Sequence, residues 1–100
     1  MAEQFDLYRD PQGSLLLVLQ SDAVDTLDTR VFASVVPTGK GGVSSLDRLS
    51  VPLNFAEREY RVMLNLLGTA RLGWMGERVG NYAHLRDQIT RAFDLLYSGI

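Results

Sequence analysis

Hydrophobic and polar residues alternate in the first part of this chain, which is the pattern of a β-strand. Residues 4–9 alternate strictly, and a turn sequence at residues 10–13, Asp-Pro-Gln-Gly, separates them from an almost continuously apolar segment at residues 14–20. Alternation predicts a half-buried strand, whereas a continuous apolar segment predicts a central strand covered on both faces. Because proline presets φ in a turn and glycine tolerates positive φ, we expect an opening hairpin.

The middle of the chain continues the strand pattern. Residues 30–36 are rich in β-branched side chains and lie between an acidic segment at 22–28 and a Pro–Gly-rich segment at 37–42, both typical of loops. Two further apolar segments flank a polar turn and predict a second hairpin. We therefore expect strands over residues 30–36, 49–55 and 60–67, and a short final strand over residues 70–75.

The period changes from 2 to 3.6 near residue 81. Asn81 is a suitable N-cap for a helix, and Gly99 can end it. Apolar residues recur at helical spacing between them, which predicts one buried helix face. These residues are Tyr82, Leu85, Ile89, Ala92, Phe93 and Leu96. The expected fold is one domain over residues 1–100, mostly β, an antiparallel sheet or small barrel with a C-terminal α-helix.

The composition of the chain excludes several classes of function. The 100 residues carry a net charge of −2, so no basic surface for direct nucleic-acid binding is expected. The absence of cysteine excludes disulfides and thiolate chemistry. The longest apolar run, Leu15–Leu19, is too short to span a membrane, and no signal peptide is visible. We expect a cytoplasmic protein.

Catalytic and metal-binding patterns are weak. The only histidine, His84, has no spacing that suggests a triad with Ser44 or Ser45, and one histidine without cysteine makes a metal site or a cofactor unexpected. Tyr60 and Trp74 fall in predicted strands, where aromatic residues usually belong to a core or an interface. These residues therefore give no spacing that indicates a catalytic or metal site.

Two segments have an unusual composition. The amphipathic helix runs directly into Tyr97-Ser98-Gly99-Ile100, which places an aromatic and an aliphatic residue at the end of the chain. The segment Gln20–Thr26 holds two small apolar residues, Ala23 and Val24, inside an acidic loop. A terminus contributes little to a core, so its apolar residues are well placed to contact a partner.

The pattern of one family matches the chain over nearly its whole length. The matching residues are Gln4-Phe5, Gln20-Ser21-Asp22-Ala23-Val24-Asp25-Thr26, Gly76-Glu77-Arg78-Val79, the helix positions His84, Ile89, Ala92 and Leu95, and the terminal Gly99-Ile100. On these residues the chain resembles the CcdB family, the toxins of plasmid-type toxin–antitoxin modules. The segment Gln20–Thr26 together with the terminal Gly-Ile is the most specific part of this resemblance.

The resemblance implies a homodimeric, SH3-like barrel with a C-terminal helix, a fold shared with ribonuclease toxins of the MazF/Kid type. It also implies a toxin without catalytic activity that binds the DNA gyrase A subunit, acts as a topoisomerase poison by trapping the gyrase–DNA cleavage complex, and serves plasmid maintenance. A cognate CcdA-like antitoxin would neutralise the toxin and regulate transcription with it. The implied gyrase-binding residues are Ala23, Val24, Asp94, Tyr97, Ser98, Gly99 and Ile100; the implied antitoxin-binding residues are Tyr8, Arg9, Asp10 and Gln12.

The chain departs from the best-known family members at the implied gyrase site. Those members have Trp at the position of Ser98, Asn at that of Asp94, and two Ile at those of Ala23 and Val24. Two alternatives therefore stay open. One is a MazF-like endoribonuclease, for which Arg30 and Arg61 are the candidate cationic groups. The other is a detoxified homologue that binds only an antitoxin.

Overall fold

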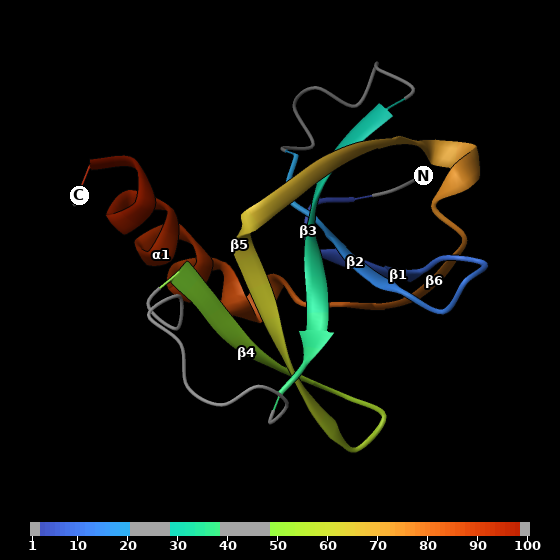
Figure 1. The fold of residues 1–100 in the computed structure, drawn as a ribbon, viewed down its shortest axis with the longest axis horizontal. Helices are drawn as coiled ribbons and strands as arrows, with labels where there is room; N and C mark the ends of the chain where they lie inside the picture. Colours follow the sequence, from blue (N-terminus) through green and yellow to red (C-terminus); the bar gives the residue numbers. More distant parts are fainter. Residues whose placement is uncertain (1–2, 21–28, 39–48, 99–100) are drawn as a thin grey trace.

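Six antiparallel strands form one curled sheet, and a helix packs against one end of it (Figure 1). The computed structural model describes residues 3–20, 29–38 and 49–98, with side chains as far as Leu95. The order in the sheet is β4-β5-β3-β2-β1-β6. The strands are β1 (Asp6–Arg9), β2 (Leu15–Val18), β3 (Thr29–Pro37), β4 (Ser50–Phe55), β5 (Arg58–Arg71) and β6 (Glu77–Asn81), and the helix is α1 (Arg86–Ser98). This confirms the mostly-β prediction with a C-terminal helix.

The predicted opening hairpin is confirmed. Strand β1 pairs with β2 in the register Leu7↔Leu17, and the Asp10 carboxylate closes the turn by accepting bonds from the backbone N–H groups of Gln12 and Ser14, both at 2.9 Å. Gly13 has a φ of +89°, which a glycine adopts without strain. The turn predicted from Asp-Pro-Gln-Gly is therefore held by the side chain of Asp10 and made possible by the positive φ of Gly13.

Strand β2 is buried along its whole length because the protein has a core on each face of it. The larger core includes Leu15 and Leu17, and α1 closes it with Ile89. The smaller core holds Val18 and Met75, with Tyr8 and other side chains packed around them. The continuous apolar pattern of this strand is thus explained by burial on both sides.

The prediction of two separate strands at residues 60–67 and 70–75 is wrong. Strand β5 is one element of 14 residues that extends to Arg71, and Leu72–Trp74 form a 3₁₀ turn. Its first half lies between β3 and β4, and after a shift in register opposite Ala33 and Ser34 it pairs with β3. The bulge interrupts the alternation of apolar and polar residues, which is why one strand resembles two.

The last strand, β6, was not predicted. Its sequence, Glu-Arg-Val-Gly-Asn, lies at the edge of the sheet and pairs with β1 alone. An edge strand with exposed side chains has no apolar alternation to reveal it. This strand nevertheless joins two segments that lie far apart in the sequence, because it pairs residues 77–81 with residues 6–9.

The buried face of the predicted helix is confirmed for its described side chains. Leu85, Ile89 and Ala92 are buried in the larger core. The α-helix begins at Arg86, later than expected, because Ala83–Leu85 form a 3₁₀ turn whose first N–H bonds the Asn81 side chain at 3.0 Å. Within the described part of the chain, no helix is long and apolar enough to cross a membrane.

Candidate functional site

The C-terminal end of α1 extends beyond the part of the helix that is anchored to the sheet. Ile89 and Ala92 are buried, Phe93 packs partly buried against the larger core, and Asp94 is exposed. Figure 1 shows the C-terminal end of the helix at the margin of the molecule, past β4. Among the described residues, α1 packs mainly against β4, β5 and the 3₁₀ turn before it.

Among the residues predicted to bind gyrase, the structure places Asp94 on the exposed face of α1 and the backbone of Tyr97 and Ser98 in its last turn. The other four lie outside the described residues; they are Ala23, Val24, Gly99 and Ile100. The loop that carries the first two begins at Gln20, whose side-chain oxygen accepts a bond from the N–H of Val31 at 3.3 Å. The structure therefore gives the backbone position of the helix end and the position of Gln20, the last described residue before the loop.

The residues predicted to bind an antitoxin lie around the β1–β2 turn, but they do not share one surface. Arg9 is exposed and forms a 3.5 Å ion pair with Glu77. Tyr8 points to the smaller core beside Val18 and Met75, and burial, followed by the charge of Asp6, raises the pKa of its phenol. Asp10 is used in the turn, so Arg9 and the exposed Gln12 are the residues of this set presented to a partner.

A buried carboxylate fastens β1 to β6. Asp6 has no solvent exposure and accepts bonds from Arg78 Nε, Asn81 Nδ2 and the N–H of Glu3, each at 2.9 Å. The hydrogen bond and the charge of Asp6 raise the pKa of Arg78. A buried charge with three donors is stably satisfied, so this cluster is structural.

The candidate groups for ribonuclease chemistry lie apart. Arg30 is 2% exposed and donates to the carbonyl of Thr29, while Arg61 donates to the Ser50 hydroxyl at 2.7 Å. In the β3–β5 ladder, Arg30 pairs with Ala70 and Arg61 pairs with Val36. Because Arg30 and Val36 are about six residues apart on β3, roughly 20 Å of strand separates the two arginines. His84 stacks beside Tyr82 at the start of the helix. Within the described residues no group of His, Asp and Glu could hold a metal ion.

Comparison with known proteins supplies the decisive observation. The model of the CcdB protein family matches residues 4–99, nearly the whole chain. The chain belongs to the CcdB family. This membership places it among the toxins of toxin–antitoxin systems, and no curated protein matches it significantly in sequence.

Solved structures show that the CcdB fold of this chain is shared with other toxins. An Mtb toxin is 17% identical, with a TM-score of 0.72 over 91% of this chain and 99% of that one. An endoribonuclease from mycobacterial species is 14% identical, with a TM-score of 0.73 over 93% and 88% of the two chains. The Mycobacterium tuberculosis toxin MazF-mt6 is 19% identical, with a TM-score of 0.64 over 89% and 96%. At these identities the likeness shows the fold alone.

The CcdB motif Gln4-Phe5 has an architectural role. Phe5 adopts a φ of +69° and bonds Val18 and Tyr82 through its N–H and carbonyl, both at 2.7 Å. The Gln4 side chain donates to the carbonyl of Leu19 and accepts from Arg86. These two residues thus connect the end of β2 with the start of the helical segment.

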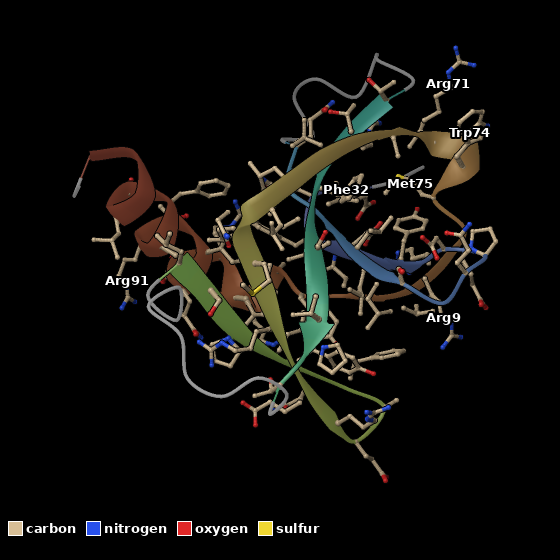
Figure 2. All side chains as sticks on the ribbon, in the orientation of Figure 1. Arg9, Phe32, Arg71, Trp74, Met75 and Arg91 are labelled. Atoms are coloured by element: carbon tan, nitrogen blue, oxygen red, sulfur yellow. The ribbon has the colours of Figure 1, made fainter. Side chains whose placement is uncertain are left out.

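Trp74 lies outside the core, and the prediction that it belongs to a strand is wrong; that it belongs to an interface stays a prediction. It is 74% exposed because it belongs to the 3₁₀ turn after β5, and the guanidinium of Arg71 lies 5.9 Å from its ring centre (Figure 2). Leu66 and Leu67 on β5 are also about half exposed, at 47% and 48%. Tyr60 is partly buried against the larger core, as expected. Sequence periodicity placed Trp74 in a strand because the end of β5 was misplaced.

Proposed function

We propose that this CcdB family member is a toxin that binds the DNA gyrase A subunit and traps the gyrase–DNA cleavage complex. The observation that carries the proposal is the outward extension of α1, whose last turn bears Tyr97 and Ser98 beyond the buried Ile89 and Ala92. A helix that is anchored through Ile89, Ala92 and Phe93 can present its end to a partner without loss of the core. The implied site includes Ala23, Val24, Asp94, Gly99 and Ile100 as well.

The toxin acts by binding and has no catalytic activity of its own. Among the described residues, the candidate groups Arg30, Arg61 and His84 belong to three separate places, and Arg30 is buried. General acid–base cleavage of RNA needs such groups within hydrogen-bond reach of one phosphate. The endoribonuclease alternative therefore has the shared fold in its favour, and the described residues of one chain do not bring these groups together.

We include two partners in the proposal. A cognate antitoxin binds near Arg9 and neutralises the toxin; a related fold has been solved as an endoribonuclease in complex with its cognate antitoxin. A second copy of the chain covers the exposed Leu66 and Leu67. Both leucines lie in the second half of β5, which pairs with β3 and not with β4. The side of β5 that faces away from β3 is therefore suited to an interface.

The test is the affinity for purified gyrase A subunit, measured by isothermal titration calorimetry. Deletion of residues 97–100 is expected to abolish binding while circular dichroism and the oligomeric state stay unchanged, since the buried residues of α1 are retained. The matched control is Thr90→Ala on the exposed face of the same helix, which should bind normally. Full affinity after the deletion would show that the site is elsewhere, and cleavage of RNA by the purified protein would favour the endoribonuclease.

A further inference from the structure

An open groove of about 330 Å³ lies between the helix and the edge of the sheet, where α1 packs beside β4 (Figure 1). We name it the helix groove and define it by six residues that line it: Val51 and Pro52 from β4, and Gln88, Arg91, Ala92 and Leu95 from α1. Its volume is at the lower end of the range of about 300–1,000 Å³ that is common for ligand sites. The helix groove therefore suits a small molecule better than a large partner.

The floor and the walls of the helix groove are apolar. Gln88, Ala92 and Leu95 recur at helical spacing and lie along one face of α1, and the short side chain of Ala92 leaves space between the other two. Ala92 and Val51 are buried in the larger core, whereas Leu95 is partly exposed and Pro52 is exposed. An aliphatic chain between Pro52 and Leu95 would remove their apolar surface from water, which favours binding.

The free edge of β4 does not favour a partner strand as the occupant. Strand β4 is at the end of the sheet order and pairs with β5. Pro52 has no N–H to donate, and the carbonyl of Asn54 already accepts the Tyr82 hydroxyl at 2.6 Å. An added strand would meet a missing donor and an engaged acceptor within three residues. The helix groove therefore favours an occupant that needs no backbone ladder.

Arg91 determines the polar end of the occupant. Among the described residues that line the helix groove, Arg91 is the one that carries a charge, and it is exposed (Figure 2). Its guanidinium can bind a carboxylate through two parallel hydrogen bonds. Two exposed carboxylates flank it on α1, Asp87 four residues before and Asp94 three residues after. They would repel a polyanion, whereas a single carboxylate can pair with Arg91.

We infer that the helix groove binds a small aliphatic monocarboxylate, with its chain between Pro52 and Leu95 and its carboxylate at Arg91. The apolar walls select the chain, and the single cation selects the head group. This ligand site goes beyond gyrase binding and does not depend on it.

The inference is tested by NMR titration of methyl-labelled protein with octanoate and with octanamide, which has the same chain and no charge. The wild-type protein should bind octanoate at least about tenfold more tightly than octanamide or acetate, because only octanoate uses both the guanidinium and the apolar walls. The methyl signals of Val51 and Leu95 should shift. Arg91→Glu should reverse the preference, so that octylammonium binds more tightly than octanoate. The matched control Arg71→Glu makes the same charge change at the end of β5, outside the helix groove, and should keep the preference for octanoate (Figure 2).

Three results would overturn the inference: no saturable shift with octanoate at about 10 mM, equal affinities of the wild-type protein for octanoate and octanamide, or a preference for octanoate that survives Arg91→Glu. Shifts centred on Leu66 and Leu67 would also contradict it, because they would place the ligand on the exposed part of β5. Circular dichroism confirms the fold of Arg91→Glu, whose side chain lies outside the buried core. None of these measurements uses gyrase, so failure of the gyrase proposal leaves the ligand site standing.

Discussion

Gly76 lies so close to the backbone of Arg9 that a Cβ atom at residue 76 would overlap the Arg9 carbonyl oxygen. Gly76 also has a φ of +92°, a conformation that residues with a side chain rarely adopt. The Gly-Glu-x-Val motif, which contributed to the resemblance with CcdB toxins, therefore has a physical cause. It brings the chain from the 3₁₀ turn into β6 directly against β1.

Replacing Gly76 by alanine should strongly destabilise the protein. The Cβ would clash with backbone that cannot move aside as a flexible side chain can, and the positive φ adds strain of about 1–2 kcal/mol. We expect a loss of more than about 2 kcal/mol in the free energy of unfolding, measured by urea denaturation. Gly73→Ala is the control, because a Cβ there has no atom within 4 Å. Equal effects of the two substitutions would contradict this account.

The β4–β5 hairpin can be stabilised at its turn. Ala56 and Glu57 connect the paired residues Phe55 and Arg58 with φ values of +52° and +64°, the signs of a type I′ turn. Asn-Gly is the preferred sequence for this turn, so the double substitution Ala56→Asn, Glu57→Gly should raise the free energy of unfolding by about 1 kcal/mol. Urea denaturation measures the change. An unchanged or lower stability would show that the turn is not strained.

Alkaline pH should destabilise the protein through Tyr82. Burial raises the pKa of its phenol above the ordinary 10.0, and the hydroxyl donates to the Asn54 carbonyl at 2.6 Å. Because the pKa of Tyr82 is higher in the folded state than in the unfolded state, its contribution to the free energy of unfolding is complete below pH 10.0. This contribution is lost as the pH rises through the folded-state pKa. The urea midpoint should thus fall above this pH, and less steeply in Tyr82→Phe. Parallel curves for the two proteins would exclude Tyr82 as the cause.

Restoring the aromatic residue of the best-known CcdB members should strengthen gyrase binding. Trp is a frequent anchor of interfaces and often contributes more than about 2 kcal/mol, so Ser98→Trp is expected to increase the affinity for gyrase A subunit by about 30-fold. Calorimetry measures this change. Thr90→Trp, which adds the same side chain to an exposed position earlier in α1, should leave the affinity unchanged. If both variants gained equally, general adhesiveness would be the explanation.

Local patterns predicted those elements whose burial follows a regular period. The β1–β2 hairpin and the apolar face of α1 are examples, since Leu17 and Ile89 lie where alternation and helical spacing place them. The end of β5 and strand β6 could not be predicted in this way. A bulge in the former and an exposed edge position in the latter remove the pattern, and Trp74 was misplaced as a result.

The candidate site was predictable only in part. The sequence pointed to the end of α1, and the outward extension of this helix supports that interpretation. The cavity that Arg9 and Arg58 both line could not be foreseen, because these residues are far apart in the sequence and approach it only through the order β5-β3-β2-β1 in the sheet. Tyr8 and Arg9 were predicted to act together, yet neighbouring residues of a strand point to opposite faces.

The most direct test of the central claim is a DNA cleavage assay with purified gyrase, supercoiled plasmid and ATP, in which trapped complexes are released as linear DNA by detergent and protease. The account predicts that the full-length protein causes linear plasmid to accumulate and that the variant lacking residues 97–100 does not. Absence of linear DNA with the folded full-length protein, or equal amounts with both proteins, would contradict gyrase poisoning through the end of α1.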